Sequence, residues 1–363
     1  MAEDLVRVTE QGLYCQAGDF YIDPWRSVKR ALITHGHSDH ARSGSASYLA
    51  HTDSRGILRL RLGEEAKIET IDYGVPITIK DVIVSFHPAG HILGSSQIRI
   101  EYRGQICVVS GDYKTQRDPS CQAIEPVRCH TFITESTFGL PIYRFPSPEI
   151  IAAEVNQWWQ ANANEGKVSI LYAYSLGKAQ RLLMSVDPSI GPIYTHGAVE
   201  ALNAVYRGCG VKLPATTYVG DVRKEDIARN ALVVAPPNAQ DSLWARKFGK
   251  ISDAFASGWM RVRGARRRRS LDRGFVMSDH ADWQGLTETI AATGAERVLV
   301  THGYTPPLVR YLTDLGLDAH ALETAFTGEE GSDKLDTGKE TGVDRETGTD
   351  RETGTDNETG ALQ

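Results

Sequence analysis

The sequence predicts an α/β protein in which one sheet-rich body is interrupted by a second α/β unit. Short β-rich runs separated by turns fill the first 140 residues. From about residue 147, strand and helix patterns alternate, which is typical of a parallel sheet. At 363 residues and 39.9 kDa, the chain also exceeds one typical compact domain.

The first part of the chain contains apolar runs that are rich in β-branched residues. Each is four or five residues long, and most end at Gly, Pro, His or Asp, which favours strands over helices. These expected strands are Ala31–Thr34, Val82–Phe86, Ser96–Ile100, Ile106–Ser110 and Thr131–Thr134.

The second part begins with a helix signal, because Ser147 and Pro148 fit the cap and first helical position of a helix that continues through Gln160. The elements expected after it, in order, are strand Val168–Tyr174, helix Gly177–Val186, strand Pro192–Thr195, helix Ala198–Tyr206 and strand Ala231–Ala235. The closing elements are strand Gly274–Val276, helix Asp282–Ala292, strand Arg297–Thr301 and helix Pro306–Leu315.

These patterns predict four segments: a sheet-rich body over 1–145, an insertion over 146–270, a return to the body over 271–327, and a tail over 328–363. The tail repeats a polar six-residue unit that begins at Asp344, Asp350 and Asp356. Such a segment cannot bury enough apolar surface to offset its ordering entropy, so we expect it to be disordered.

The net charge of −6 conceals two opposite features. Residues 328–360 contain eleven acidic and four basic residues, a net of −7, which leaves +1 for the rest of the chain. Within that rest, seven arginines lie between Arg261 and Arg273, a pattern that favours contact with phosphates. A solvated basic surface is the alternative interpretation.

Composition argues against several other classes of protein. No run of 18 apolar residues is present, so a membrane span is not expected. The acidic start Met1–Asp4 lacks a signal-peptide pattern, which favours a cytoplasmic protein. The five cysteines are scattered, without a C-x-x-C pair, so neither a disulfide framework nor a thiolate zinc site is expected.

The most informative segment places His35, His37, Asp39 and His40 within six residues, directly after an apolar strand. Imidazole and carboxylate are ligands that Zn²⁺ and Mn²⁺ accept. His91 and Asp112 also follow expected strands, where α/β sites are usually built. A bridging carboxylate such as that of Asp112 suits two ions about 4 Å apart.

Here the sequence resembles the metallo-β-lactamase superfamily, whose fold is an αβ/βα sandwich. His35-x-His37-x-Asp39-His40 is similar to its signature motif, and His91 and Asp112 match its third and fourth motifs. The resemblance implies that Asp23, rather than Asp19, is the aspartate that supports the site.

Three later motifs resemble the β-CASP group of nucleic-acid-processing members, in which an α/β domain is inserted into the sandwich. They contain Glu135 in Thr134–Gly139, His280 in Ser278–Asp282, and His302 in Val298–Gly303. The segments Gly18–Trp25 and Ala173–Arg181 resemble bacterial ligase-associated DNA exonucleases most closely.

The resemblance implies two divalent ions, Zn²⁺ or Mn²⁺, and a metal-activated hydroxide that hydrolyses phosphodiesters. The first ion would take His35, His37, His91 and Asp112, and the second would take Asp39, His40, Asp112 and His302. His280 would protonate the leaving oxygen or hold the phosphate, and Glu135 would orient it. A structural hydrogen-bonded pair is the alternative for His280 and Glu135.

The resulting functional hypothesis is a DNA exonuclease of 5′ to 3′ polarity in DNA repair, with DNA ligase and helicase as partners and no membrane partner. Substrate contacts are expected from the loop with Ser175 and Lys178 and from the basic run Arg266, Arg267, Arg268 and Arg269. A β-CASP ribonuclease and a non-catalytic nucleic-acid-binding scaffold remain the alternatives; a simple helix cap is the alternative for the Ser175 loop.

Overall fold

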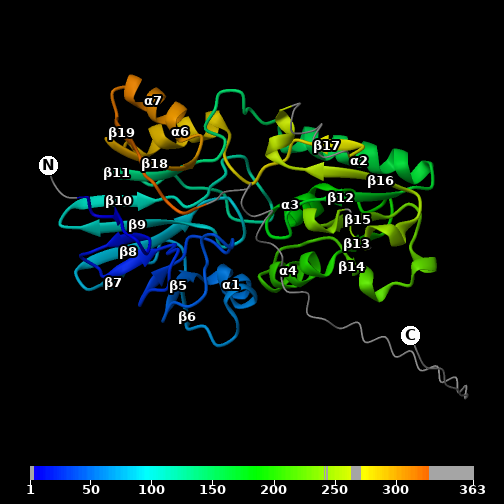
Figure 1. The fold of residues 1–363 in the computed structure, drawn as a ribbon, viewed down its shortest axis with the longest axis horizontal. Helices are drawn as coiled ribbons and strands as arrows, with labels where there is room; N and C mark the ends of the chain where they lie inside the picture. Colours follow the sequence, from blue (N-terminus) through cyan, green and yellow to red (C-terminus); the bar gives the residue numbers. More distant parts are fainter. Residues whose placement is uncertain (1–3, 241, 243, 263–270, 327–363) are drawn as a thin grey trace, which may run out of the picture.

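The computed structural model describes residues 4–240, 242, 244–262 and 271–326, and it shows a mixed α/β protein with three sheets in that part of the chain (Figure 1). The first sheet has the order β1 (Arg7–Val8), β2 (Leu13–Cys15), β3 (Phe20–Ile22), β4 (Ala31–Leu32), β5 (Tyr48–His51) and β6 (Ile68–Ile71). The second sheet has the order β19 (Asp318–Ala321), β18 (Arg297–Gly303), β11 (Thr131–Ser136), β10 (Gln105–Val109), β9 (Ser96–Tyr102), β8 (Val82–Pro88) and β7 (Ile77–Ile79).

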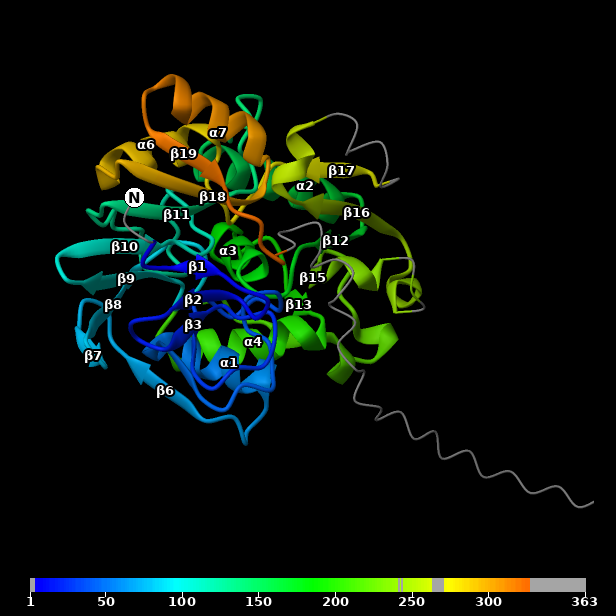
Figure 2. The same ribbon diagram turned by 60° about the vertical axis from the view of Figure 1, so that its left-hand side comes forward.

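The first and second sheets pack face to face and form a sandwich. Alternate residues of both sheets, such as Phe20 and Phe86, share one buried apolar core, as expected for strands with one inward face. Helix α1 (Arg55–Leu62) covers the outer face of the first sheet, and helices α6 (Trp283–Thr293) and α7 (Thr305–Asp314) cover that of the second (Figure 2). The sandwich therefore has four layers.

The third sheet belongs to a separate unit that enters the chain between β11 and α6. Its strands are all parallel, in the order β14 (Thr217–Tyr218), β13 (Ile193–Thr195), β15 (Leu232–Ala235), β12 (Val168–Tyr172), β16 (Ile251–Ala256) and β17 (Arg273–Phe275). Helices α2 (Pro148–Asn164), α3 (Lys178–Ser185) and α4 (Gly197–Gly208) pack with it around one large core. Because β17 pairs with β16, we propose that the inserted unit extends to about residue 277 rather than to 270.

The two units meet through α1 and the loop after β8 on one side and the α3–α4 region on the other (Figure 1). Ile57, Leu93, Leu176 and Tyr206 form a small apolar cluster there, and the Tyr206 hydroxyl accepts a hydrogen bond from the Leu93 amide at 3.2 Å. The loops that carry the predicted ligands lie next to this boundary.

Each strand and helix that the sequence predicts occurs in the structure, with ends that differ by at most four residues. Helix α1 differs from the prediction, because the sequence pattern of the first 140 residues favours strands separated by turns. The predicted tail, 328–363, lies outside the described residues. In the part of the chain that the structure describes, no helix combines the length and the apolar character needed to cross a membrane.

Candidate metal centre

The predicted ligands come from loops at one edge of the sandwich. His35 follows β4, His91 follows β8, and Asp112 follows β10. His302 is the penultimate residue of β18. Strands β8, β10, β11 and β18 run in the same direction, so their carboxyl ends meet at that edge. Residues that are far apart in the sequence therefore converge there.

Asp112 lies at the centre of the cluster. Its Oδ2 atom is 3.5 Å from His35 Nε2, 3.6 Å from His40 Nε2 and 3.9 Å from His91 Nε2. Its Oδ1 atom is 3.2 Å from His302 Nε2. Asp39 adds a second buried carboxylate, 3.8 Å from His40 Nε2. One carboxylate thus faces ring nitrogens from both predicted ligand sets.

Each of the five histidines has one ring nitrogen held by the protein and the other directed into the cluster. The holding partners are Thr34 Oγ1 for His35 at 3.0 Å, Leu176 O for His37 at 3.3 Å, Asp23 Oδ2 for His40 at 2.8 Å, Asp279 O for His91 at 2.8 Å and Thr301 Oγ1 for His302 at 3.2 Å. A carbonyl or carboxylate partner accepts the N–H, which leaves a lone pair on the inner nitrogen.

The inward atoms are the ones that the protein leaves unsatisfied. Among the described residues, the Nε2 atoms of His35, His40 and His302 and the Oδ1 atom of Asp112 are buried and have no hydrogen-bond partner. The inner nitrogens of His37 and His91 face each other at 3.0 Å. Buried polar atoms without partners cost free energy, and divalent cations would satisfy all of them, so the donor set fits such ions.

The electrostatics of two histidines and of Asp112 are consistent with this fit. Burial, reinforced by neighbouring histidines, holds the pKa values of His35 and His91 well below the usual range, so both rings are neutral, the form that binds a cation. Burial raises the pKa of Asp112, but His40 and the other nearby histidines outweigh it and hold that pKa well below its usual range. Asp112 is therefore ionised at neutral pH. Burial lowers the pKa of His40, but Asp112, Asp39 and Asp23 outweigh it and raise that pKa to about 10, so a cation has to displace a proton from this ring.

Of the two candidates for the supporting aspartate, Asp23 lies at the site. Its carboxylate accepts hydrogen bonds from the Thr34 amide at 2.7 Å and from His40 Nδ1 at 2.8 Å, and it is buried. Asp19 instead pairs with Lys80 at 3.1 Å in a half-exposed position. Asp23 therefore fixes both the strand end and the orientation of the His40 ring.

His280 and Glu135 form a buried pair beside the cluster. His280 Nδ1 lies 2.9 and 3.0 Å from the two Glu135 oxygens, and the Tyr113 amide donates to Glu135 at 2.8 Å. Burial lowers the pKa of His280, but Glu135 and then Asp112 outweigh it and raise that pKa to about 10. The structure therefore presents a protonated imidazole next to Asp112.

The Ser175 loop contacts the site, but it does so differently from the prediction. Lys178 is fully buried, with its ammonium 3.2 Å from Asp279 and over the Tyr174 ring at 4.4 Å. Its predicted direct contact with a phosphate is thus corrected to a buried ion pair that supports the His280 loop. The Ser175 hydroxyl is buried and has no hydrogen-bond partner among the residues that the structure describes, and its phosphate contact stays a prediction. Arg266, Arg267, Arg268 and Arg269 lie outside the described residues.

Sequence reasoning missed Arg181, which joins both units at the site. Its guanidinium donates to Asp118 at 2.5 Å, to the His91 carbonyl at 3.3 Å and to the Ser278 carbonyl, and it is buried. The loops with His91 and His280 are therefore tied to helix α3 by one side chain. The only signal in the sequence was its position after Lys178 in Ala173–Arg181.

Replacing Arg181 with methionine is expected to lower the free energy of unfolding by about 3–5 kcal/mol, because it leaves Asp118 buried without its counter-charge. Chemical denaturation measures this. Changing Asp118 to leucine in the same chain should recover part of the loss. The control is Arg223→Met, which breaks an exposed pair with Asp226 and should have a negligible effect. Equal losses in the two single variants would contradict the interpretation.

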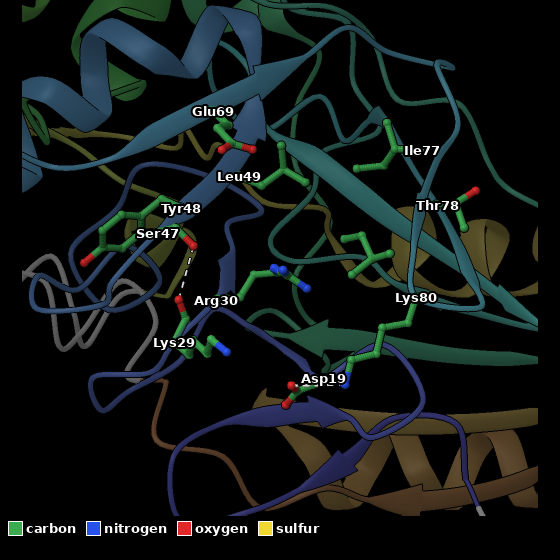
Figure 3. A pocket seen from close by; sticks show the side chains of 11 residues that line it. Asp19, Lys29, Arg30, Ser47, Tyr48, Leu49, Glu69, Ile77, Thr78 and Lys80 are labelled. Atoms are coloured by element: carbon green, nitrogen blue, oxygen red, sulfur yellow. Dashed lines mark hydrogen bonds and ion pairs between the residues drawn. The ribbon is translucent and has the colours of Figure 1, made fainter.

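A pocket elsewhere in the sandwich is separate from this chemistry. Lys29, Arg30, Tyr48 and Lys80 line it together with Asp19 (Figure 3). Lys29 and Arg30 precede β4, and Lys80 precedes β8, whereas the predicted ligands follow these strands. The pocket therefore lies at the opposite end of the sandwich from the metal cluster.

Comparison with known proteins relates the chain to enzymes of nucleic acids. It is 31% identical over 316 residues to a probable DNA ligase of Opitutus terrae, which covers 86% of this chain and 30% of that protein. It is 28% identical over 173 residues to endoribonuclease YSH1 of Gibberella zeae and 33% identical over 160 residues to endoribonuclease ysh-1 of Neurospora crassa. These matches cover 46% and 43% of this chain and 20% and 18% of the fungal proteins, so the chain spans less than a third of each relative.

No protein-family profile matches the chain. A solved structure of a protein of unknown function from Enterococcus faecalis V583 superposes with a TM-score of 0.54 at 12% identity, over 76% of each chain, which supports the mixed α/β fold alone. The sequence matches to the endoribonucleases and to the probable DNA ligase connect the chain to a nuclease-related group of proteins.

Proposed function

We propose that the chain is a metal-dependent nuclease of the metallo-β-lactamase superfamily, in its β-CASP group, and that it hydrolyses phosphodiester bonds. The observation that carries this proposal is the convergence of inward ring nitrogens from four histidines on Asp112, with several of these atoms buried and unsatisfied. The inserted α/β unit and its apolar contact with the sandwich agree with the β-CASP arrangement.

The residues divide the chemistry between them. His35, His37, His91 and Asp112 would hold one cation, and Asp39, His40, Asp112 and His302 would hold the other; Zn²⁺ and Mn²⁺ both suit these donors. When bound, such ions neutralise phosphate charge and lower the pKa of water to about 7. Protonated His280 then donates its proton to the leaving oxygen, and Glu135 keeps its ring in place.

We propose DNA as the substrate and a DNA exonuclease in repair as the role. The relative from Opitutus terrae is named a probable DNA ligase, and its match extends over most of both units of this chain. The 5′ to 3′ polarity and the association with a DNA ligase and a helicase rest on the resemblance to ligase-associated exonucleases. The endoribonuclease relatives favour RNA equally, so a ribonuclease is the second candidate.

Matched DNA and RNA strands of one sequence, labelled at either end, test the proposal with Mn²⁺ or Zn²⁺ added to metal-free protein. We expect DNA to be shortened, with the 5′ label released first as a small product. Preference for RNA would replace the proposal with its second candidate. Cleavage of neither polymer by protein that has bound two ions would favour a non-catalytic scaffold.

A further inference from the structure

The segment after β19 crosses the strand-end edge of the sandwich and reaches the metal cluster. It leaves the second sheet through a hydrogen bond from the Leu322 amide to the Val300 carbonyl at 2.8 Å. Further on, the Ala325 carbonyl accepts a hydrogen bond from Arg42 Nη2 at 3.4 Å. These two contacts direct the next residue, Phe326, towards the predicted ligands.

Phe326 packs on two ligands of the second set. Its ring stacks on the His40 ring with centroids 4.4 Å apart and an interplanar angle of 9°, and it meets the His302 ring edge-on at 5.8 Å. Trp25 contacts the Phe326 ring in turn, at 5.8 Å and 82°. Within the part of the chain that the structure describes, the Phe326 ring contacts ligands of the second set and none of the first.

The stacking of Phe326 restricts tilting of the His40 ring. Asp23 fixes the position of Nδ1, but a single hydrogen bond allows the ring to tilt about it. His35 lies 4.1 Å from His40, centroid to centroid, so the ring is held between His35 and Phe326. With both contacts in place, His40 Nε2 remains aimed at Asp112.

We propose that Phe326 is a positioning residue for the second metal ion, and that its ring completes this half of the centre. The inference rests on the proposed function, because it requires a two-ion site. It adds that the second ion site depends on the Phe326 ring, whereas the first does not. Outer-shell partners of metal ligands commonly affect affinity by 10–100-fold.

Ion binding to metal-free, full-length protein tests the proposal without measuring turnover. Calorimetric titration with Mn²⁺, repeated with Zn²⁺ against a competing chelator, gives the number of ions and the affinity of each. We expect Phe326→Ala to weaken the second ion by about tenfold or more and to leave the first unchanged. Phe326→Tyr and Phe326→Trp, which keep a flat ring on His40, should restore wild-type affinity.

Leu322→Ala is the matched control, because it removes a partly buried apolar side chain from the same segment and leaves the Phe326 ring on His40. It should leave both affinities intact, and thermal unfolding of metal-free protein should show similar small losses for the two alanine variants. Equal ion binding by Phe326→Ala and wild type would overturn the inference. Loss of both ions in Phe326→Ala, or of the second ion in Leu322→Ala, would do so as well. Wild-type protein that binds fewer than two ions would instead overturn the proposed two-ion function itself.

Discussion

Asp112→Ala is expected to abolish cleavage, with kcat/KM reduced by about 10⁴-fold or more, equivalent to roughly 5.5 kcal/mol of transition-state stabilisation. The reason is geometric: Asp112 lies within 4 Å of four imidazoles, which come from three separate segments of the chain. Its loss removes a carboxylate from both proposed ion sites at once. Turnover of labelled DNA and the metal content of the purified protein measure the two consequences.

Asp112→Asn separates charge from shape. The amide has the size of the carboxylate but no negative charge, so it should also lose activity and most bound metal. Both variants should remain folded by circular dichroism, because the core between the two sheets does not contain Asp112. Activity near the wild-type level in the asparagine variant would contradict the bridging role of Asp112.

Much of the fold could be predicted because its strands and helices carry clear local signals. Helix α1 shows where such signals fail. Its sequence, Arg-Gly-Ile-Leu-Arg-Leu-Arg-Leu, alternates apolar and polar residues at its end as a strand does, and Gly56 disfavours a helix. Packing decides its structure: Ile57 is buried against the inserted unit and Leu58 against the first sheet, while Leu60 is exposed.

The candidate site likewise contains residues that the sequence predicts and residues that it does not. The dense motif at His35–His40 indicates a metal site from spacing alone, because it places three imidazoles and one carboxylate within six residues. The roles of Lys178, Arg181 and Phe326 depend on which segments meet at the boundary between the units and at the end of β19, and no local pattern encodes that meeting. An exposed phosphate contact and a buried ion pair both suit a lysine at the start of a helix, so the sequence alone could not distinguish them.

His280→Ala is expected to lower kcat by about 10²–10⁴-fold while both ions remain bound, because the residue is assigned to proton donation rather than to ion binding. The companion change, Glu135→Gln, keeps a hydrogen-bond acceptor but removes the charge that most strongly opposes the effect of burial on the His280 pKa. That pKa, about 10 with Glu135 present, should therefore fall in the variant.

The sign of the pH effect follows from this shift. A proton donor works below its pKa, so kcat should fall on the alkaline side, and in Glu135→Gln that decline should begin at lower pH than in wild type. Bound cations would lower the pKa of His280 in both proteins, which leaves the direction of the difference unchanged. The raised pKa also stabilises the folded metal-free protein fully below about pH 6.5, and this stabilisation is lost as the pH rises through about 10. Measuring kcat against pH for both proteins decides the role: identical alkaline limbs, with a uniform loss of rate, would mean that the pair is structural and that another group donates the proton.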